Sequence, residues 1–438
     1  MIARSNEPPI PVTPESSAVD GAVRSAAWRV IPLLAVGYIV SYIDRANISF
    51  AALTMNRDLG LTATQFGFIA GTFYAGYCLF EIPSNIALQR FGARRWLARI
   101  MVSWGLAAAG TCLAQGPTSL AVFRFLTGAC EAGFYPGVMF YLSVWFPLEV
   151  RARAFAWFNI ANPLSSVISG PLSISLLGLD GHLGFAGWRW LLLCEGIPAC
   201  LLGIYILYAL PDGPRDARWL SDDQKNALQR RLAAEQHPGK EQNFWAALRH
   251  PQMLILSCSF FCAVVGIQGI TLWLPQILRY HGLSMAATGL IATVPYVLAC
   301  IGLIVWSYHM DRTRAFLRNY VGCCALAAFG FAVAGAVDSV PGLLVGASMA
   351  LIGMNACRPA IFSLVPVHLQ GSAAAAGMAL VTSIGNLGGF FGPLMMGRLK
   401  DSTGSFAAGL LGLAGILALA AVVALLVNAV ARPAVRVP

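Results

Sequence analysis

The sequence predicts an all-α membrane protein with twelve transmembrane helices, arranged in two pseudo-symmetric six-helix bundles. Three observations lead to this prediction: an apolar composition, a series of long apolar segments, and one long charged segment that divides the series. Of the 438 residues, 58% are hydrophobic and 11% are charged, whereas about 25% of an average soluble protein is charged. So few charges cannot cover a soluble surface, so we expect lipid to surround most of the chain.

The apolar segments give the number of helices. A helix that crosses the hydrocarbon core of a bilayer needs about 20 mostly apolar residues. Six such segments precede the charged segment and six follow it, so the bundles are expected at residues 29–210 and 251–430. The predicted spans are 29–52, 66–88, 96–115, 119–142, 152–176, 188–210, 251–279, 286–306, 317–337, 341–364, 373–397 and 405–430.

The remaining segments are polar. Residues 1–28 contain several prolines and are predicted to form a disordered tail, and 431–438 form a second short tail. The charged segment 211–250 is predicted to be a linker with a short helix at 220–234. Arginine and lysine are concentrated in the tails, the linker and alternate loops. The positive-inside rule therefore places both termini in the cytoplasm of a multi-pass protein of the inner (plasma) membrane.

Composition and spacing also exclude several classes of protein. The net charge of +10 does not indicate nucleic-acid binding, because the basic residues are spread over short loops between apolar segments. The eleven cysteines show neither the CxxC nor the Cys/His spacing of a metal site, so we expect no metal and no cofactor. The spans show no nucleophile–base pair, which argues against a membrane enzyme. We expect a monomer.

Charged residues inside the predicted spans are the candidates for function, because a charge at the bilayer centre costs about 2.5–3.5 kcal/mol. The first span contains Asp44 and Arg45 side by side. Adjacent helical residues diverge by about 100°, so these side chains are expected on different walls of the helix. Arg45 shares its wall with Tyr42, and Asp44 lies near Asn47. Both charges could serve transport or could brace the packing of the helices.

The fourth span places Arg124 and Glu131 on one helix face, together with Tyr135. They lie about 10 Å apart along the axis of an unbent helix, so each needs another partner: a residue on the first span, a water or a substrate. A buried carboxylate without a permanent cation takes up a proton readily. We therefore predict that Asp44 and Glu131 couple protons to transport. Arg45 and Arg124 are permanent cations that suit a substrate carboxylate, and a structural role is the alternative.

Polar residues in other spans extend the predicted substrate site. Arg358 in the tenth span has no acidic residue nearby in that span. It either binds a second substrate carboxylate or hydrogen-bonds to backbone. For several of the other candidates, packing of buried polar groups is nearly as good an explanation as contact with substrate. The predicted substrate-binding residues are Tyr42, Arg45, Tyr77, Arg124, Asn162, Gln268, Arg358 and Asn386.

Gates are predicted towards the cytoplasmic ends of the spans. A basic turn follows the second span and another follows the eighth, so the two halves repeat a feature, as in other transporters. Glu81 and Glu195 stand shortly before prolines and are expected near the cytoplasmic part of the bundle, in gate or packing roles. The predicted gating residues are Glu81, Arg90, Arg94, Asp311 and Arg312.

Several short strings extend the interpretation to a family. They are Ser41-Tyr42-Ile43-Asp44-Arg45, Glu131-Ala132-Gly133-Phe134, Glu195-Gly196-Ile197-Pro198 and Ser383-Ile384-Gly385-Asn386. With these strings the chain resembles the major facilitator superfamily, and within it the anion:cation symporter group, which includes bacterial tartrate, 4-hydroxyphenylacetate and phthalate permeases.

The resemblance implies a function. It implies proton-coupled uptake (symport) of a small organic anion, such as tartrate, a sugar acid or an aromatic carboxylate, by alternating access. It also implies that the acids at Asp44 and Glu131 couple protons. Arg358 departs from the family pattern, in which an apolar or aromatic residue is common beside this proline, and the additional cation favours a dianion. The resemblance further implies that substrate contacts Tyr42, Arg45, Tyr77, Arg124 and Asn386.

A proton-driven exporter and a membrane sensor are the alternative functions. A proton-driven exporter often has a glycine–proline pair followed by paired glycines in the fifth span. Here Gly170-Pro171 is followed by Leu172-Ser173-Ile174, so half of that pattern is present. Internal arginines also suit anions better than cationic drugs. A membrane sensor is less favoured still, because both tails are short.

Overall fold

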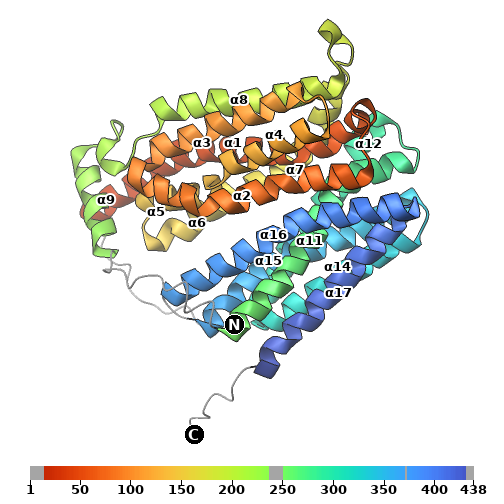
Figure 1. Cartoon of the computed structure of the whole chain (residues 1–438). Helices are drawn as coiled ribbons and strands as arrows, with labels where there is room; N and C mark the ends of the chain where they lie inside the picture. The colour runs from red at the N-terminus through yellow and green to blue at the C-terminus, as the bar shows by residue number, and fades with distance from the viewer. Residues whose placement is uncertain (1–13, 236–249, 370–371, 431–438) are drawn as a thin grey trace.

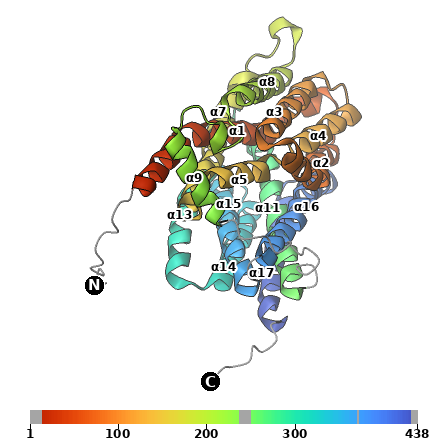
Figure 2. The same cartoon turned by 90° about the vertical axis from the view of Figure 1, so that its left-hand side faces the viewer.

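The computed structural model describes residues 14–235, 250–369 and 372–430, and most of them lie in helices. The helices form two groups, which Figure 1 shows one above the other: red to light green for the first group and green to blue for the second. Figure 2, turned by 90°, shows the helix α9 (Asp222–Glu235) at the side of the first group, near the start of α1. The predicted all-α class is confirmed.

The two groups have the following helices. The first contains α1 (Pro14–Asp58), α2 (Ala63–Phe91), α3 (Ala93–Gly110), α4 (Pro117–Glu131), α5 (Phe134–Trp145), α6 (Leu148–Asn159), α7 (Ala161–Leu177) and α8 (Gly187–Ala209). The second contains α11 (Pro251–Tyr280), α12 (Met285–Ile291), α13 (Val294–Thr313), α14 (Phe316–Ala336), α15 (Val340–His368), α16 (Ser372–Thr403) and α17 (Ala407–Val430).

Ten helical segments among the described residues are long and apolar enough to cross a membrane. Two predicted spans are not among the ten. The second predicted span lies in α2, which is not apolar enough to be counted. The fourth is divided between α4 and α5, and each part is too short to cross a bilayer alone.

A glycine causes this division, so the prediction of one helix over 119–142 is wrong. α4 ends at Glu131, and Gly133 then adopts the left-handed conformation, with φ 87° and ψ −4°. A Cβ atom on Gly133 would lie 2.3 Å from the Ser84 Oγ atom of α2, so only glycine fits without a shift of the neighbour. Tyr135 follows the break and is therefore not on a continuous stripe with Glu131.

The start of α1 also differs from the prediction. Residues 1–28 were expected to be disordered, but α1 begins at Pro14. Ala22 and Ala26 are fully buried, and this part of α1 packs against α9. The expected linker helix at 220–234 corresponds closely to α9. Residues 1–13, the rest of the linker at 236–249, and the tail at 431–438 lie outside the described residues.

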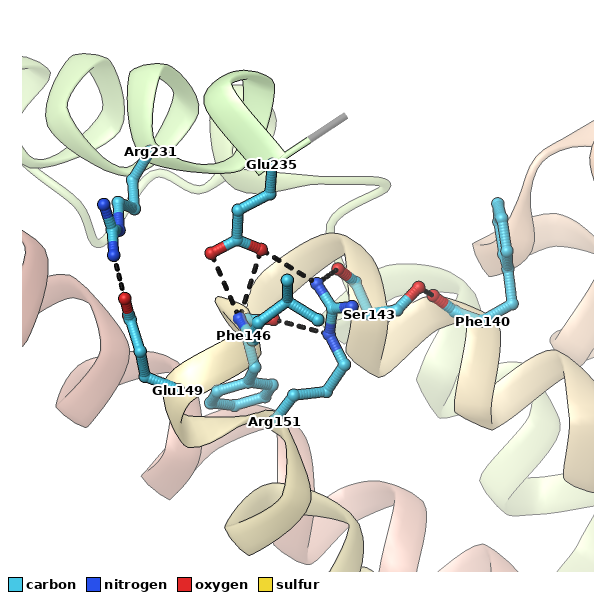
Figure 3. Close-up of polar contacts among 8 residues, drawn as sticks. Phe140, Ser143, Phe146, Glu149, Arg151, Arg231 and Glu235 are labelled. Carbon is cyan, nitrogen blue, oxygen red and sulfur yellow. Dashed lines mark hydrogen bonds and ion pairs between the residues drawn. The ribbon is translucent and has the colours of Figure 1, made fainter. Parts of the chain in front are cut away.

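Ionic contacts hold α9 against the first group (Figure 3). Both carboxylate oxygens of Glu235 accept the Leu148 backbone N–H at 3.1 Å, and one of them also accepts Arg151 Nη2 at 3.3 Å. Arg231 and Glu149 form a second ion pair between α9 and α6. The described part of the linker is therefore fixed to the helices that precede it.

The two groups of helices meet mainly at the end of the bundle away from the linker. The Asp401 carboxylate at the end of α16 accepts the backbone N–H groups of Ala63 and Thr64, at 3.1 and 2.7 Å. These N–H groups belong to the first turn of α2 and have no acceptor within the helix. At the same end, Asn56 Nδ2 of α1 donates to Gln276 Oε1 of α11 at 3.2 Å.

The geometry of Gly133 leads to a testable prediction. Gly133→Ala adds a left-handed alanine, which costs about 1–2 kcal/mol, together with a clash against Ser84. Gly60→Ala is the matched control, because Gly60 also has a positive φ but has open space around its Cβ position. We expect a clearly larger loss of thermal stability in Gly133→Ala, measured by unfolding of the purified protein in detergent. Equal losses in the two variants would contradict the close contact between position 133 and Ser84.

Candidate functional site

A cavity lies between the two groups of helices. The space open to the centres of water molecules is about 110 Å³. A single water needs roughly 10–15 Å³ of such space, so the cavity can hold several waters or a small solute. The lining comes from α1, α2 and α7 on one side and mainly from α11, α13 and α15 on the other. The polar lining residues are Tyr42, Arg45, Ser49, Tyr74, Asn162, Ser166, Ser169, Gln268, Thr271, Thr293, Tyr296, Asn355 and Arg358.

An ion pair lies directly behind one wall of this cavity. Glu131 of α4 is completely buried, and its Oε1 atom accepts Arg45 Nη2 at 2.7 Å and Arg45 Nε at 2.8 Å. Ser41 Oγ donates to the same oxygen at 2.5 Å. The other oxygen, Oε2, has no hydrogen-bond partner among the described residues.

The pair decides between the partners that the sequence left open for Glu131, which were a residue on the first span, a water or a substrate. The proton role was argued for a buried carboxylate without a permanent cation. Arg45 supplies that cation from α1. Helical periodicity describes one helix at a time and gives no register between neighbouring helices, so the contact could not be derived from it.

Arg45 is positioned by aromatic rings. Its guanidinium carbon lies 5.0 Å from the ring centre of Tyr77 and 5.3 Å from those of Tyr42 and Phe73, close enough for cation–π attraction. The Arg45 side chain is 20% exposed and lines the cavity. One cation therefore contacts the buried carboxylate of Glu131 and the space where a solute would lie.

Asp44 points away from the cavity, as the divergence of adjacent helical residues indicates. Trp104 Nε1 of α3 donates to Asp44 Oδ2 at 2.6 Å, and Asn47 Nδ2 donates to Oδ1 at 3.3 Å. Asp44 is 2% exposed. It forms no ion pair among the described residues, so its carboxyl is held by neutral donors.

Arg124 lies deeper than a residue that lines the cavity. It is 3% exposed, and its Nε atom has no hydrogen-bond partner in the described part of the chain. Its guanidinium carbon is 5.1 Å from the ring centre of Phe73, the same ring that lies beside Arg45. Phe73 therefore contacts both cations. The substrate contact predicted for Arg124 stays a prediction.

The second half of the chain contributes another cation to the cavity. Arg358 of α15 lines the cavity and lies beside Tyr42 of the opposite half. Gln268 of α11 and Asn162 of α7 also line the cavity. Arg45 and Arg358 thus face one small space from opposite halves.

Besides Arg124, two more predicted substrate contacts and the predicted gates lie outside the cavity lining. Tyr77 is buried against Arg45, and Asn386 of α16 lies beside Glu81 of α2. Arg94 pairs with Asp212 at 3.3 Å within the first half. The remaining predicted gating residues lie near helix ends: Arg90 beside Phe91, Arg312 beside Tyr308, and the exposed Asp311 in the last turns of α13.

Several residues of the site were missed by sequence reasoning. Ser41 binds the Glu131 carboxylate, and Ser166, Ser169 and Thr271 line the cavity. A hydroxyl in an apolar span is common and carries no charge, so the sequence gives no signal that separates these residues from ordinary helix packing.

The chain is similar to known membrane transporters. The family model described as "Major Facilitator Superfamily" matches residues 34–393. A protein of Agrobacterium vitis named "Putative tartrate transporter" is 43% identical over 93% of this chain and 95% of its own length. A quinolone resistance transporter of Acinetobacter baumannii is 37% identical over 89% of this chain and 90% of its own length.

The fold also matches solved structures. A bacterial homolog of the human lysosomal transporter Spinster, in an inward-facing and occupied conformation, superimposes with a TM-score of 0.72. The alignment covers 93% of this chain and 97% of the other, at 18% sequence identity. At that identity the comparison is evidence for the fold alone.

The contact of Phe73 with two arginines leads to a prediction. Phe73→Leu keeps an apolar side chain but removes the ring that both guanidinium groups contact. Each cation–π contact contributes about 0.5–2 kcal/mol. Phe331→Leu is the matched control, because Phe331 is equally buried and no cation is found on its ring among the described residues. We expect a larger loss of thermal stability for Phe73→Leu. A loss no larger than that of the control would exclude a ring contribution to both cations.

Proposed function

Since the chain belongs to the major facilitator superfamily, we propose that it takes up a small organic dicarboxylate together with protons. Membership makes it a multi-pass membrane transporter and not an enzyme, as predicted from the sequence. The observation that carries the finer proposal is the position of Arg45, which binds Glu131 on one side and lines the cavity on the other.

The ion pair supplies a mechanism for coupling. While Glu131 is ionised, it holds Arg45 through two hydrogen bonds, and the cation is already neutralised. When Glu131 binds a proton, Arg45 loses its partner and attracts a carboxylate from the cavity. Buried charges are costly unless paired. Counted with one substrate carboxylate, the Arg45–Glu131 pair is neutral both before and after the exchange, so a proton and that carboxylate enter together.

Two cations support a dianion as substrate. Arg45 and Arg358 face the same cavity from opposite halves, so one carboxylate can bind each of them. Arginine binds carboxylates through paired, charge-assisted hydrogen bonds. Amides and hydroxyls at Asn162, Gln268 and Ser49 can accept and donate bonds to the hydroxyl groups of a hydroxy acid. Tartrate has both features, and it is the substrate in the name of the Agrobacterium relative.

A dianion would also connect the two halves. Bound to Arg45 and Arg358, it would hold them together around a compensated set of charges, and its release would let them separate. This is the behaviour that alternating access requires. We propose that both termini and the linker lie in the cytoplasm, and that the chain acts as a monomer in the inner (plasma) membrane.

Export is the second candidate. The similarity to a quinolone resistance transporter favours it, because that relative is 37% identical over most of both chains. An exporter of the same fold would use the same ion pair with the proton moving in the opposite direction to the solute. Net flux of L-tartrate into proteoliposomes under an inward proton gradient separates the two, since only the importer accumulates it.

Glu131→Gln tests the coupling. Glutamine keeps the size and accepts from Ser41, but it cannot titrate or neutralise Arg45. We expect the variant to lose proton-driven accumulation of L-tartrate in proteoliposomes while it still catalyses counterflow exchange. Glu149→Gln is the control, because Glu149 is an exposed acid that pairs with Arg231 near the linker. Unchanged acid-driven uptake in Glu131→Gln would remove Glu131 from the proton path.

Arg358→Gln tests the second carboxylate site. Loss of a charged hydrogen-bond partner costs about 1.5–3 kcal/mol, which is a loss of roughly 10- to 150-fold in affinity. We expect this loss for L-tartrate but little change for a monocarboxylate such as glycerate, measured by thermal shift of the purified protein. Arg312→Gln, at a helix end outside the cavity, is the control. Equal losses for both acids would argue against one carboxylate on each arginine.

A further inference from the structure

A groove lies on the second group of helices, apart from the central cavity. It is formed where α13 passes into α14, together with the last turns of α15 and the end of α17. About 680 Å³ of the groove is open to the centres of water molecules, which is more than the central cavity offers. Three of its lining residues are basic, namely Arg314, Arg318 and His368, and the other seven are apolar. Among the described residues none lines both spaces, so the groove is a separate site.

The groove opens on a surface that faces lipid in a membrane. The helices α14 and α17, which lie side by side in Figures 1 and 2, contribute no residue to the described lining of the central cavity. α17 is apolar enough to cross a membrane, and it exposes Leu419, Val422 and Leu426. Contiguous exposed apolar residues of this kind mark a surface that contacts lipid. The apolar part of the groove therefore continues into the acyl chains of the bilayer.

The basic residues lie at one end of this surface. Successive spanning helices run in opposite directions, so α14 begins, and α15 and α17 end, where the linker joins α11. Along α14, Val321 follows Arg318 by about one turn towards the bilayer centre. Along α15, Leu364 precedes His368 by the same step. The basic residues are therefore at the level of the lipid headgroups, and apolar lining lies deeper.

The positive charge in the groove has no counter-ion in the described part of the chain. Arg314 and Arg318 are exposed, and neither side chain forms an ion pair with a described residue. The nearest acid along the chain, Asp311, does not line the groove. Two arginines that share one groove without an acid favour a ligand with net negative charge.

The backbone at Arg314 favours a functional reason for this arginine. Arg314 has φ 52° and ψ 11°, a left-handed conformation that L side chains rarely adopt. Glycine or asparagine would fit this turn with less strain. The chain therefore places a cation where a smaller residue would give a more stable turn, and a change to asparagine should not disturb the fold.

An anionic phospholipid matches these features better than a soluble anion. Its phosphate can accept hydrogen bonds from both arginines, and an acyl chain can cover the apolar lining. A soluble anion would use the arginines alone and leave the seven apolar residues uncovered. Basic pockets between spanning helices at a membrane surface are typical sites for anionic headgroups.

We propose that this groove binds one anionic phospholipid, with its phosphate on Arg314 and Arg318 and one acyl chain against Val367 and Leu425. The bound lipid bridges α14, α15 and α17 at the membrane surface and stabilises the second group of helices. The site goes beyond the transport of a dicarboxylate, and it does not involve the Arg45–Glu131 pair.

Titration of the purified protein with lipid tests the binding, because a ligand that binds the folded state raises the melting temperature. Each arginine near an anionic lipid contributes about fivefold in affinity. For the double variant Arg314→Asn/Arg318→Gln in neutral detergent micelles, we expect about 25-fold more phosphatidylglycerol to be needed for the same shift. Phosphatidylcholine, which has no net charge, should give little shift with either protein.

Arg312→Gln is the matched control for this titration. Arg312 lies in the last turn of α13 but does not line the groove, so the variant should respond to phosphatidylglycerol as the unsubstituted protein does. An equal requirement for phosphatidylglycerol in the double variant and in Arg312→Gln would overturn the proposal, and so would an equal shift with phosphatidylcholine. Should the double variant not fold, Arg318→Gln alone should need about fivefold more phosphatidylglycerol.

A second comparison separates a lipid from a free phosphate. The soluble compound glycerol 3-phosphate carries the headgroup charge without acyl chains, and we expect no shift at concentrations where phosphatidylglycerol is effective. Burial of one CH₂ group contributes about fourfold in affinity, so Leu425→Gln should weaken the binding of phosphatidylglycerol at least about fourfold. Leu426→Gln is the control, because Leu425 and Leu426 are 53% and 48% exposed and only Leu425 lines the groove. A full shift with glycerol 3-phosphate, or equal effects of the two leucine variants, would exclude the lipid.

These measurements contain no transported solute, so their outcome is independent of the proposed function. If the protein does not take up L-tartrate, the lipid titrations still decide whether the groove binds phosphatidylglycerol. If the groove binds no lipid, the accumulation and counterflow experiments on Glu131→Gln still decide the coupling.

Discussion

The ion pair of Arg45 and Glu131 is the interaction on which the site depends. It joins α1 to α4 through a carboxylate that is completely buried. Several features of the fold serve this contact. Gly128 lets the backbones of α4 and α2 approach until a Cβ atom would lie 1.9 Å from the Phe73 carbonyl oxygen, and Gly133 ends α4 directly after Glu131. The cation is available to a solute because the same side chain lines the cavity.

The polar groups behind this pair form a layered arrangement in the first half of the chain. Arg45 lies next to the cavity, Glu131 lies behind it, and Arg124 is buried beside the ring of Phe73. Asp44 occupies a separate wall with Trp104. The second half contributes Arg358, amides and hydroxyls to the cavity. The first half therefore holds the buried acids Asp44 and Glu131, and the second half contributes the cation Arg358 to the cavity lining.

Much of the fold could be predicted from the sequence, and part of the site could. Apolar segments locate the helices, and adjacent charges in one helix separate Asp44 from Arg45 correctly. A residue on the first span was one of the partners considered for Glu131, but the choice of Arg45 could not be made, because periodicity within α4 does not give the register of α1. The break at Gly133 lies within an apolar segment and has no polar signal. Glu195 lies in the third turn of α8, and its depth follows from its position along that helix and not from the nearby proline.

The contact of Asp401 with the first turn of α2 bears on how quickly the molecule can change shape. It consists of two hydrogen bonds to exposed backbone groups at the rim of the bundle. Such bonds are exchanged for bonds to water at a net cost of only about 0.5–1.5 kcal/mol each. The two bonds therefore fix how the halves are aligned at the rim but contribute little to holding them together. Most of the cost of opening this end comes from the apolar contacts beneath the bonds, such as Phe66 of α2 against Trp273 of α11 and Phe68 of α2 against Phe390 of α16.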